Sequence, residues 1–121
     1  MMPRFRFVYD GIASMLAVLS MMRERRSTLS EILAAYPRYC ILKGQYPLNP
    51  RRIPAMFTAL ERRYSDGSIN STDGLRVDWP GRWLHVRVSQ TEPIVRVICE
   101  QKGEVPRELF EELMEQVRQY A

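Results

Sequence analysis

The chain has 121 residues, of which 45% are hydrophobic and 26% are charged, a composition typical of a soluble globular domain. This length buries one usable core but excludes a large multidomain active-site cleft within these residues. The net charge is +4, and sixteen of the eighteen basic residues are Arg, which leaves open a solvated basic surface or the binding of an anion or nucleic acid.

The first predicted element is a helix over residues 12–25 that is rich in Met, Leu and Ala. Apolar residues recur at helical spacing and also occupy the remaining sides, which predicts burial nearly all round. The run is too short to span a bilayer and lacks a cleavage site, so no membrane association or signal peptide is expected. A capping-box pattern at Thr28–Glu31 begins a second helix that ends before Pro37. Residues 1–37 therefore predict a helical hairpin too small to fold alone.

The sequence pattern changes at Arg38, and the apolar residues that follow predict a strand over residues 39–45. Asn49 and Pro50 have the properties of a helix N-cap and a first helical residue. The helix that they begin carries one apolar face as far as residue 64, and an Asp-Gly pair then ends it.

Three further strands are predicted from alternating apolar residues, over residues 75–79, 83–88 and 94–100. A Pro80–Gly81 turn joins the first two into a hairpin. A last helix begins at Pro106 and again has one apolar face. The order of elements over residues 38–121 predicts an α+β domain: a four-stranded, mainly antiparallel sheet with two helices packed on one face.

The segment between the last two strands has the side chains best suited to bind a ligand. Arg87 offers a planar guanidinium that binds two phosphate oxygens at once. Ser89 and Thr91 add hydroxyls, Gln90 adds an amide, and a curled backbone adds N–H donors, while Pro93 restricts the shape of the loop. The composition predicts a phosphate cradle, although an ordinary polar hairpin loop has similar residues.

This segment, Arg87–Pro93 followed by Arg96, resembles the R-x-S-x-T-E-P-x-x-R signature of the α-D-phosphohexomutases. That family of isomerases includes phosphoglucomutases, phosphomannomutases and phosphoglucosamine mutases. The lead-in at Asp73–Val77 and the strand that holds Trp83 are similar to those of the family as well.

The resemblance extends toward the N-terminus. Asp10–Ile12 and the stretch over residues 29–39 resemble the end of the family's third domain and the linker into its fourth. The resemblance implies that residues 1–37 are a helical remnant of the third domain, and that residues 38–121 are the C-terminal phosphate-binding domain.

The resemblance also implies roles for the loop. The phosphate that is not being transferred would be held by Arg87, Ser89, Gln90 and Thr91. Its source would be a phosphosugar: a hexose 1-phosphate, hexose 6-phosphate or hexose bisphosphate. Gln90 stands where the family more often has Gly or Asn, so its role is the least defined. Glu92 and Arg96 lie four residues apart and are expected to form an ion pair that braces the loop.

Three parts of the family's catalytic machinery have no counterpart here: the phosphoserine loop, the D-x-D-x-D metal site and the sugar-reading loop. We therefore expect no catalytic residue and no cofactor in this chain, and no activity without the upstream domains of a parent enzyme, for which the family implies Mg²⁺. His85 has no partner for acid–base catalysis. Cys40 and Cys99 lie in apolar stretches without metal-binding spacing, which indicates reduced core thiols and a cytoplasmic protein.

Two other classes of function remain as alternatives. A small basic nucleic-acid-binding module would use the Arg pairs at 25–26, 51–52 and 62–63, with Trp83 or Tyr46 for base stacking. The aromatic residues occupy core-like positions, which disfavours that alternative. An interaction domain would dock through the Met-rich first helix. We instead expect the apolar surface of this helix to be part of a core that lacks its packing partner, so that the isolated chain self-associates through it.

Overall fold

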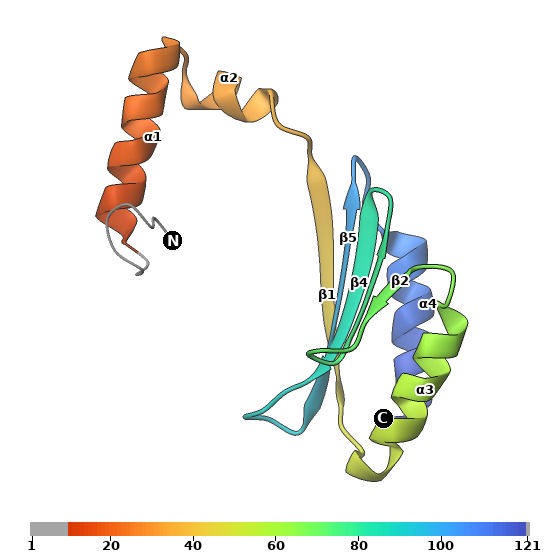
Figure 1. Ribbon diagram of the computed structural model, residues 1–121. Helices are drawn as coiled ribbons and strands as arrows, with labels where there is room; N and C mark the ends of the chain where they lie inside the picture. The colour runs from red at the N-terminus through yellow and green to blue at the C-terminus, as the bar shows by residue number, and fades with distance from the viewer. Residues whose placement is uncertain (1–9, 121) are drawn as a thin grey trace. The chain divides into compact units, whose positions relative to one another are not determined.

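The computed structural model describes residues 10–120, and the chain divides into two compact units between Pro37 and Arg38 (Figure 1). Residues 1–9, the first part of the region 1–37 that is predicted to be a helical remnant, lie outside the described residues, as does residue 121. Within residues 10–120, no helix combines the length and the apolar character needed to cross a membrane.

The first unit contains α1 (Gly11–Arg25) and α2 (Leu29–Ala34), as the sequence predicts. The capping box of α2 is present: the Thr28 backbone N–H donates to Glu31 at 2.7 Å, and the Glu31 N–H donates back to the Thr28 hydroxyl at 3.3 Å. The backbone hydrogen bond from Thr28, helped by its hydroxyl, holds the pKa of the Glu31 carboxyl below its usual range. This capping fixes where α2 begins.

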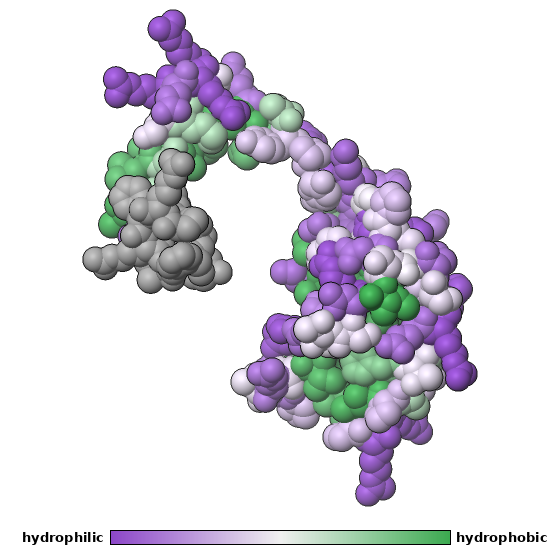
Figure 2. All heavy atoms as spheres, viewed as in Figure 1, coloured by the Kyte–Doolittle hydropathy of each residue, from purple (hydrophilic) through white to green (hydrophobic). Residues whose placement is uncertain are grey.

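The burial predicted for α1 is not found among the described residues. None of the side chains of α1 is buried, and Ile12 is 71% exposed. Figure 2 shows hydrophobic surface over this helix. The described part of this unit adds only the six residues of α2, which is too short to cover a helix that is apolar on most sides.

The second unit is an α+β domain, as predicted, but its antiparallel sheet has five strands rather than four, in the order β1-β5-β4-β3-β2. The strands are β1 (Tyr39–Pro47), β2 (Ser68–Asn70), β3 (Leu75–Trp79), β4 (Arg82–Val88) and β5 (Ile94–Lys102). The missed strand is β2, whose three residues are all exposed and pair only with β3 at the edge of the sheet. It has no buried face, so it carries no apolar alternation for a sequence reading to detect.

Two helices cover one face of this sheet, α3 (Ile53–Arg63), preceded by the 3-10 turn η1 (Pro50–Arg52), and α4 (Arg107–Arg118) (Figure 1). The core lies between them and every second residue of the strands: Met56, Leu60, Leu75, Val77, Leu84, Val86, Val95, Val97, Cys99, Leu113 and Val117. Gly44 allows α4 to approach β1, because a Cβ there would lie 2.6 Å from the sulfur of Met114. Both cysteines are free; Cys99 is buried and Cys40 partly buried.

The other face of the sheet has no helix over it within residues 38–120. Strand alternation directs charged and polar residues to this open face: Arg76 and Asp78 from β3, Trp83, His85 and Arg87 from β4, Arg96 and Glu100 from β5, and Lys43 and Gln45 from β1. Side chains from strands distant in sequence therefore become neighbours on one surface.

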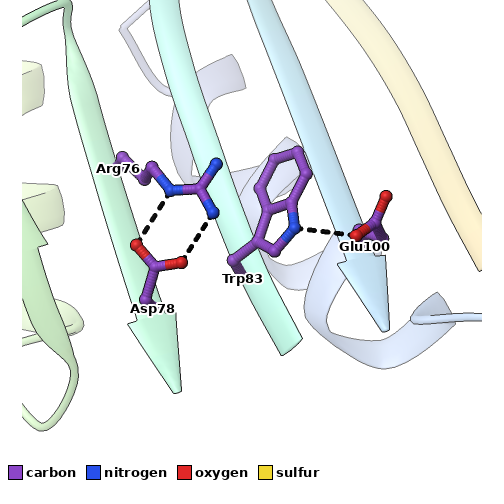
Figure 3. A network of polar contacts seen from close by, with 4 residues as sticks. All are labelled: Arg76, Asp78, Trp83 and Glu100. Carbon is purple, nitrogen blue, oxygen red and sulfur yellow. Dashed lines mark hydrogen bonds and ion pairs between the residues drawn. The ribbon is translucent and has the colours of Figure 1, made fainter. Parts of the chain in front are cut away.

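One end of the open face holds a closed polar network (Figure 3). Arg76 donates two hydrogen bonds to Asp78, at 2.8 and 2.6 Å, and its guanidinium lies 4.3 Å from the ring centre of Trp83. The hydrogen bonds to Asp78 are the main cause of a raised pKa at Arg76. Trp83 in turn donates its Nε1–H to Glu100 at 2.9 Å. Each of these four side chains therefore has its partner within the network.

Candidate anion-binding site

The candidate site is the loop between β4 and β5. Ser89 donates its backbone N–H to the carbonyl of Ile94 at 2.9 Å, which closes the hairpin. Inside the loop, the N–H of Ile94 donates to the Glu92 carbonyl at 2.8 Å. The N–H of Leu48, just after β1, donates to the Pro93 carbonyl at 2.8 Å. The loop is thus a tight turn, tied also to the strand on the far side of β5, and it extends beyond the end of the sheet (Figure 1).

The four residues predicted to bind phosphate lie on this turn and in the end of β4 that leads into it. Arg87 is near the end of β4, Ser89 is partly buried, and Gln90 and Thr91 are exposed. Among residues 10–120, no hydrogen bond engages the hydroxyls of Ser89 and Thr91 or the side-chain amide of Gln90. These donors are therefore available to a ligand, and their role in phosphate binding stays a prediction.

Arg87 has a loose ionic partner that the sequence reasoning missed. Its Nη1 lies 3.7 Å from Oδ2 of Asp73, which is beyond hydrogen-bond distance, and both side chains are solvent-exposed, by 44% and 68%. An exposed ion pair of this kind contributes about 0–1 kcal/mol. An incoming anion therefore competes with a weak interaction for the guanidinium.

The position of Asp73 is set by its neighbours. Its carbonyl accepts a hydrogen bond from Nε2–H of His85 at 2.7 Å, so the only histidine of the chain has a structural contact here. Gly74 has a φ of +76°, and a Cβ there would lie 2.2 Å from the carbonyl oxygen of Val86. Only glycine fits this approach of the loop to β4. The Asp-Gly pair before β3 is the feature of the sequence that could have indicated this contact.

Glu92 and Arg96 form an ion pair, with 2.5 Å between Oε2 and Nη2. The pair joins the loop to the beginning of β5, while its bracing role stays a prediction. Nε of Arg96 is buried and has no hydrogen-bond partner among the described residues. The guanidinium therefore binds Glu92 through one nitrogen, in contrast to the two-bond contact that Arg76 makes elsewhere on the same face.

Beside the loop, the open face has a shallow recess of about 380 Å³. Its lining comes from β1, β4 and β5: Lys43, Gly44, Gln45, Arg87, Arg96, Val97 and Ile98. Three of these residues are cations and none is an acid. The sequence reasoning missed Lys43, because only the pairing of β1 with β5 brings it near Arg96.

Other parts of the second unit are less suited to binding an anion or a metal ion. A recess of about 360 Å³ on the helical side includes Arg63 and Glu112, but these two residues pair with each other at 2.7 Å. No group of three or more His, Cys, Asp or Glu side chains within residues 10–120 is arranged to hold a metal ion. The described residues thus do not fit the Mg²⁺ that the family resemblance implies for the parent enzyme.

The aromatic residues considered for nucleic-acid stacking have other partners. Trp83 is bound to Glu100 and lies against Arg76, and Tyr46 packs against the hydrophobic core. Base stacking requires an accessible aromatic face. The nucleic-acid alternative therefore has no support in the geometry.

No protein-family model matches the chain. Similar proteins nevertheless exist among curated sequences. A probable phosphoglucosamine mutase of Methanopyrus kandleri is 34% identical over 121 residues, covering 96% of this chain and 26% of the relative. A phosphoglucosamine/phosphogalactosamine mutase of Sulfurisphaera tokodaii is 29% identical, covering 93% of this chain and 26% of the relative. A probable phosphoglucosamine mutase of Pyrococcus horikoshii is 30% identical, covering 93% and 25%.

The chain thus spans about a quarter of the length of the curated relatives that it matches. The similarity includes nearly all of the chain, and the signature segment lies in a tight loop between two antiparallel strands. From this similarity and the signature loop together, the chain belongs to the α-D-phosphohexomutase family.

Proposed function

We propose that this chain is the C-terminal phosphate-binding part of a phosphohexomutase, preceded by the end of the third domain. Its β4–β5 loop would hold the non-transferred phosphate of a phosphosugar while the other end of the sugar reacts elsewhere. The parent enzyme would be an isomerase acting by intramolecular phosphoryl transfer. The names of the relatives favour an amino-sugar phosphate among the hexose phosphates.

One observation carries this proposal: the loop presents unengaged donors beside a weakly paired arginine. Phosphate needs several donors at once, and charge-assisted hydrogen bonds are roughly twice as strong as neutral ones. The hydroxyls of Ser89 and Thr91 have no partner within the described residues, and Arg87 has only a 3.7 Å contact. The loop is also closed by backbone hydrogen bonds, so ligand binding does not need to order it.

The contribution of such a site to catalysis would be positional. A clamp on a distant phosphate uses binding energy to orient the reacting bond, which is a recognised source of rate enhancement. The residues for chemistry and the Mg²⁺ that the family implies would come from other domains of the parent enzyme. We accordingly expect no mutase activity from the 121-residue chain alone, and a cytoplasmic location for the parent.

The loop hydroxyls provide a direct test. The double variant Ser89→Ala, Thr91→Val should weaken glucose 1-phosphate binding to the full chain by about tenfold or more, since each hydrogen bond to a charged group contributes roughly 1.5–3 kcal/mol. Binding would be followed by amide NMR shifts. The matched double variant Ser65→Ala, Thr72→Val removes two exposed hydroxyls outside the loop and should bind as the wild type does. Equal affinity of the loop variant and the wild type would refute the proposed site.

The exposed apolar side chains of α1 fit the same proposal. Met15 and Leu16 are each 56% exposed, and Leu19 is 51% exposed. We propose that this surface packs against an upstream domain of the parent enzyme, and that the isolated chain self-associates through it. Sedimentation of the chain should show oligomers that the substitutions Met15→Glu and Leu19→Glu dissolve; a monomeric wild-type chain would contradict this expectation.

A further inference from the structure

The recess on the open face extends the candidate site beyond the signature loop. It shares Arg87 with the loop and adds Arg96 and Lys43 from the neighbouring strands. Arg87 and Arg96 lie directly opposite each other in the pairing of β4 with β5. Like charges in opposed positions destabilise a sheet, so the fold itself gains nothing from this arrangement.

Lys43 is the third cation of this group. Strand pairing sets it opposite Ile98, with Gln45 opposite Arg96, so Lys43 is one diagonal step from Arg96. Diagonal neighbours of this kind lie about 7–8 Å apart at the backbone, which long side chains span. Within the described residues, Arg87 and Arg96 have carboxylate partners, whereas Lys43 has no ion pair.

From this arrangement we propose that Lys43 is a further phosphate-positioning residue. Its ammonium group would approach the phosphate held by Arg87 from the side of β1, so that the phosphate is clamped between the loop and the open face of the sheet. The ligand chemistry is a phosphate dianion, either free or as a sugar phosphomonoester. The inference rests on the proposed function, because it adds a residue to the same site.

The lysine content of the chain supplies a matched control. Lys43 and Lys102 are the only two lysines in the sequence. Lys102 is also exposed and lies at the other end of β5, outside the lining of the recess. The variants Lys43→Gln and Lys102→Gln remove the same charge from the same sheet at different places. Neither side chain contributes to the core, so both variants should fold.

Titration of both variants with inorganic phosphate and with glucose 1-phosphate tests the inference. Lys43→Gln should weaken the binding of both ligands by about three- to tenfold. This effect is smaller than that of removing an arginine, because an ammonium acts as a point charge and lacks the two-pronged donor geometry of a guanidinium. Lys102→Gln should bind like the wild type. An effect of Lys43→Gln on glucose 1-phosphate alone would assign the lysine to the sugar and overturn the proposal.

The same titration separates this inference from the function on which it rests. If Lys43→Gln binds like the wild type while the amides of residues 87–91 still respond to phosphate, the lysine proposal is wrong and the loop site stands. If those amides are silent in the wild type, the loop site and the lysine proposal fail together.

Acetylation of the wild-type chain gives a second readout that needs no substitution. Phosphate should slow the acetylation of Lys43 and leave that of Lys102 unchanged, as followed by peptide mass spectrometry. Equal protection, or none, at the two lysines would contradict the proposal.

Discussion

At one end of the open face of the sheet, Arg76 is bound by Asp78 through two hydrogen bonds and lies against Trp83, whereas at the other end Arg87 meets its nearest carboxylate only at 3.7 Å. The first end, the Arg76–Asp78–Trp83–Glu100 network, has one cation and two carboxylates (Figure 3). The second end has three cations, Lys43, Arg87 and Arg96, against the carboxylates of Asp73 and Glu92.

We expect this difference to divide one sheet surface between two tasks, folding stability at one end and anion binding at the other. A guanidinium whose donors are used by the protein stabilises the strands but has little left for a ligand. A guanidinium with a distant partner contributes little to stability and is available to bind an anion. We therefore expect substitutions at the network to change folding stability, and substitutions at the loop end to change phosphate binding.

The largest effect is expected from Trp83→Ala. The substitution removes the ring that lies against Arg76 and the donor to Glu100, and should lower the free energy of unfolding by about 2–3 kcal/mol. Phosphate affinity of the folded protein should not change. Trp83→Phe keeps an aromatic ring beside Arg76 and removes the donor to Glu100, so a smaller loss of about 1 kcal/mol is expected. Urea unfolding measures both values. A loss of phosphate affinity in either folded variant would contradict the separation of roles between the two ends of the open face.

Cys99 offers an internal reporter of the same stability change. Burial raises the pKa of its thiol to about 12, so at neutral pH the group should react with iodoacetamide only when the sheet opens. Labelling of Cys99 should be faster in Trp83→Ala than in the wild type and unchanged in Arg87→Gln. Cys40, which is partly buried, should react earlier than Cys99 in every variant.

Arg87→Gln should have the opposite profile to Trp83→Ala. Loss of the guanidinium should weaken phosphate binding by about ten- to a hundredfold, because hydrogen bonds to charged groups contribute roughly 1.5–3 kcal/mol. The free energy of unfolding should stay within about 0.5 kcal/mol of the wild-type value. The variant Arg51→Gln, an exposed arginine in η1, is the matched control for net charge. Equal weakening by both substitutions would indicate a diffuse charge effect in place of a site.

A smaller effect, of the opposite sign, is expected from Asp73→Asn. Removing the carboxylate frees Arg87 and lowers repulsion of the ligand, so phosphate affinity should rise by about two- to threefold, in keeping with an exposed pair of 0.2–1 kcal/mol. Calorimetric titration at low ionic strength is the appropriate measurement. A loss of affinity would mean that Asp73 orients Arg87 and does not compete for it.

The smallest change should come from Glu92→Gln. The ion pair with Arg96 is exposed and engages one nitrogen, so the free energy of unfolding should fall by less than about 1 kcal/mol. The backbone hydrogen bonds of the loop should persist, and hydrogen exchange at the Ser89 amide should change little. Rapid exchange there would assign the ion pair a larger bracing role than its geometry suggests.

The features that the sequence predicted well are local ones. Alternation over residues 75–79 and 83–88 predicted the hairpin, Thr28 and Glu31 predicted a helix start, and the segment from Arg87 to Pro93 predicted a polar turn between strands. Each of these signals is contained within a few neighbouring residues. Local patterns of this kind suffice to predict strands, caps and turns.

The features that the sequence did not predict depend on pairing between distant segments. Lys43 joins the recess only because β1 pairs with β5, and Asp73 reaches Arg87 only because the loop before β3 folds over β4. For strands that are distant in the sequence, no pattern within a single strand records which strand it pairs with. The exposed edge strand β2 was missed for a different reason, since it lacks a buried face.

The most direct test of the contrast between the two ends is a map of backbone amide shifts in the full chain during titration with inorganic phosphate. The account predicts shifts that saturate at residues 87–91 and beside Lys43, with none around Asp78, Trp83 and Glu100. A silent loop, with broad, salt-dependent shifts at the helical arginines instead, would contradict it.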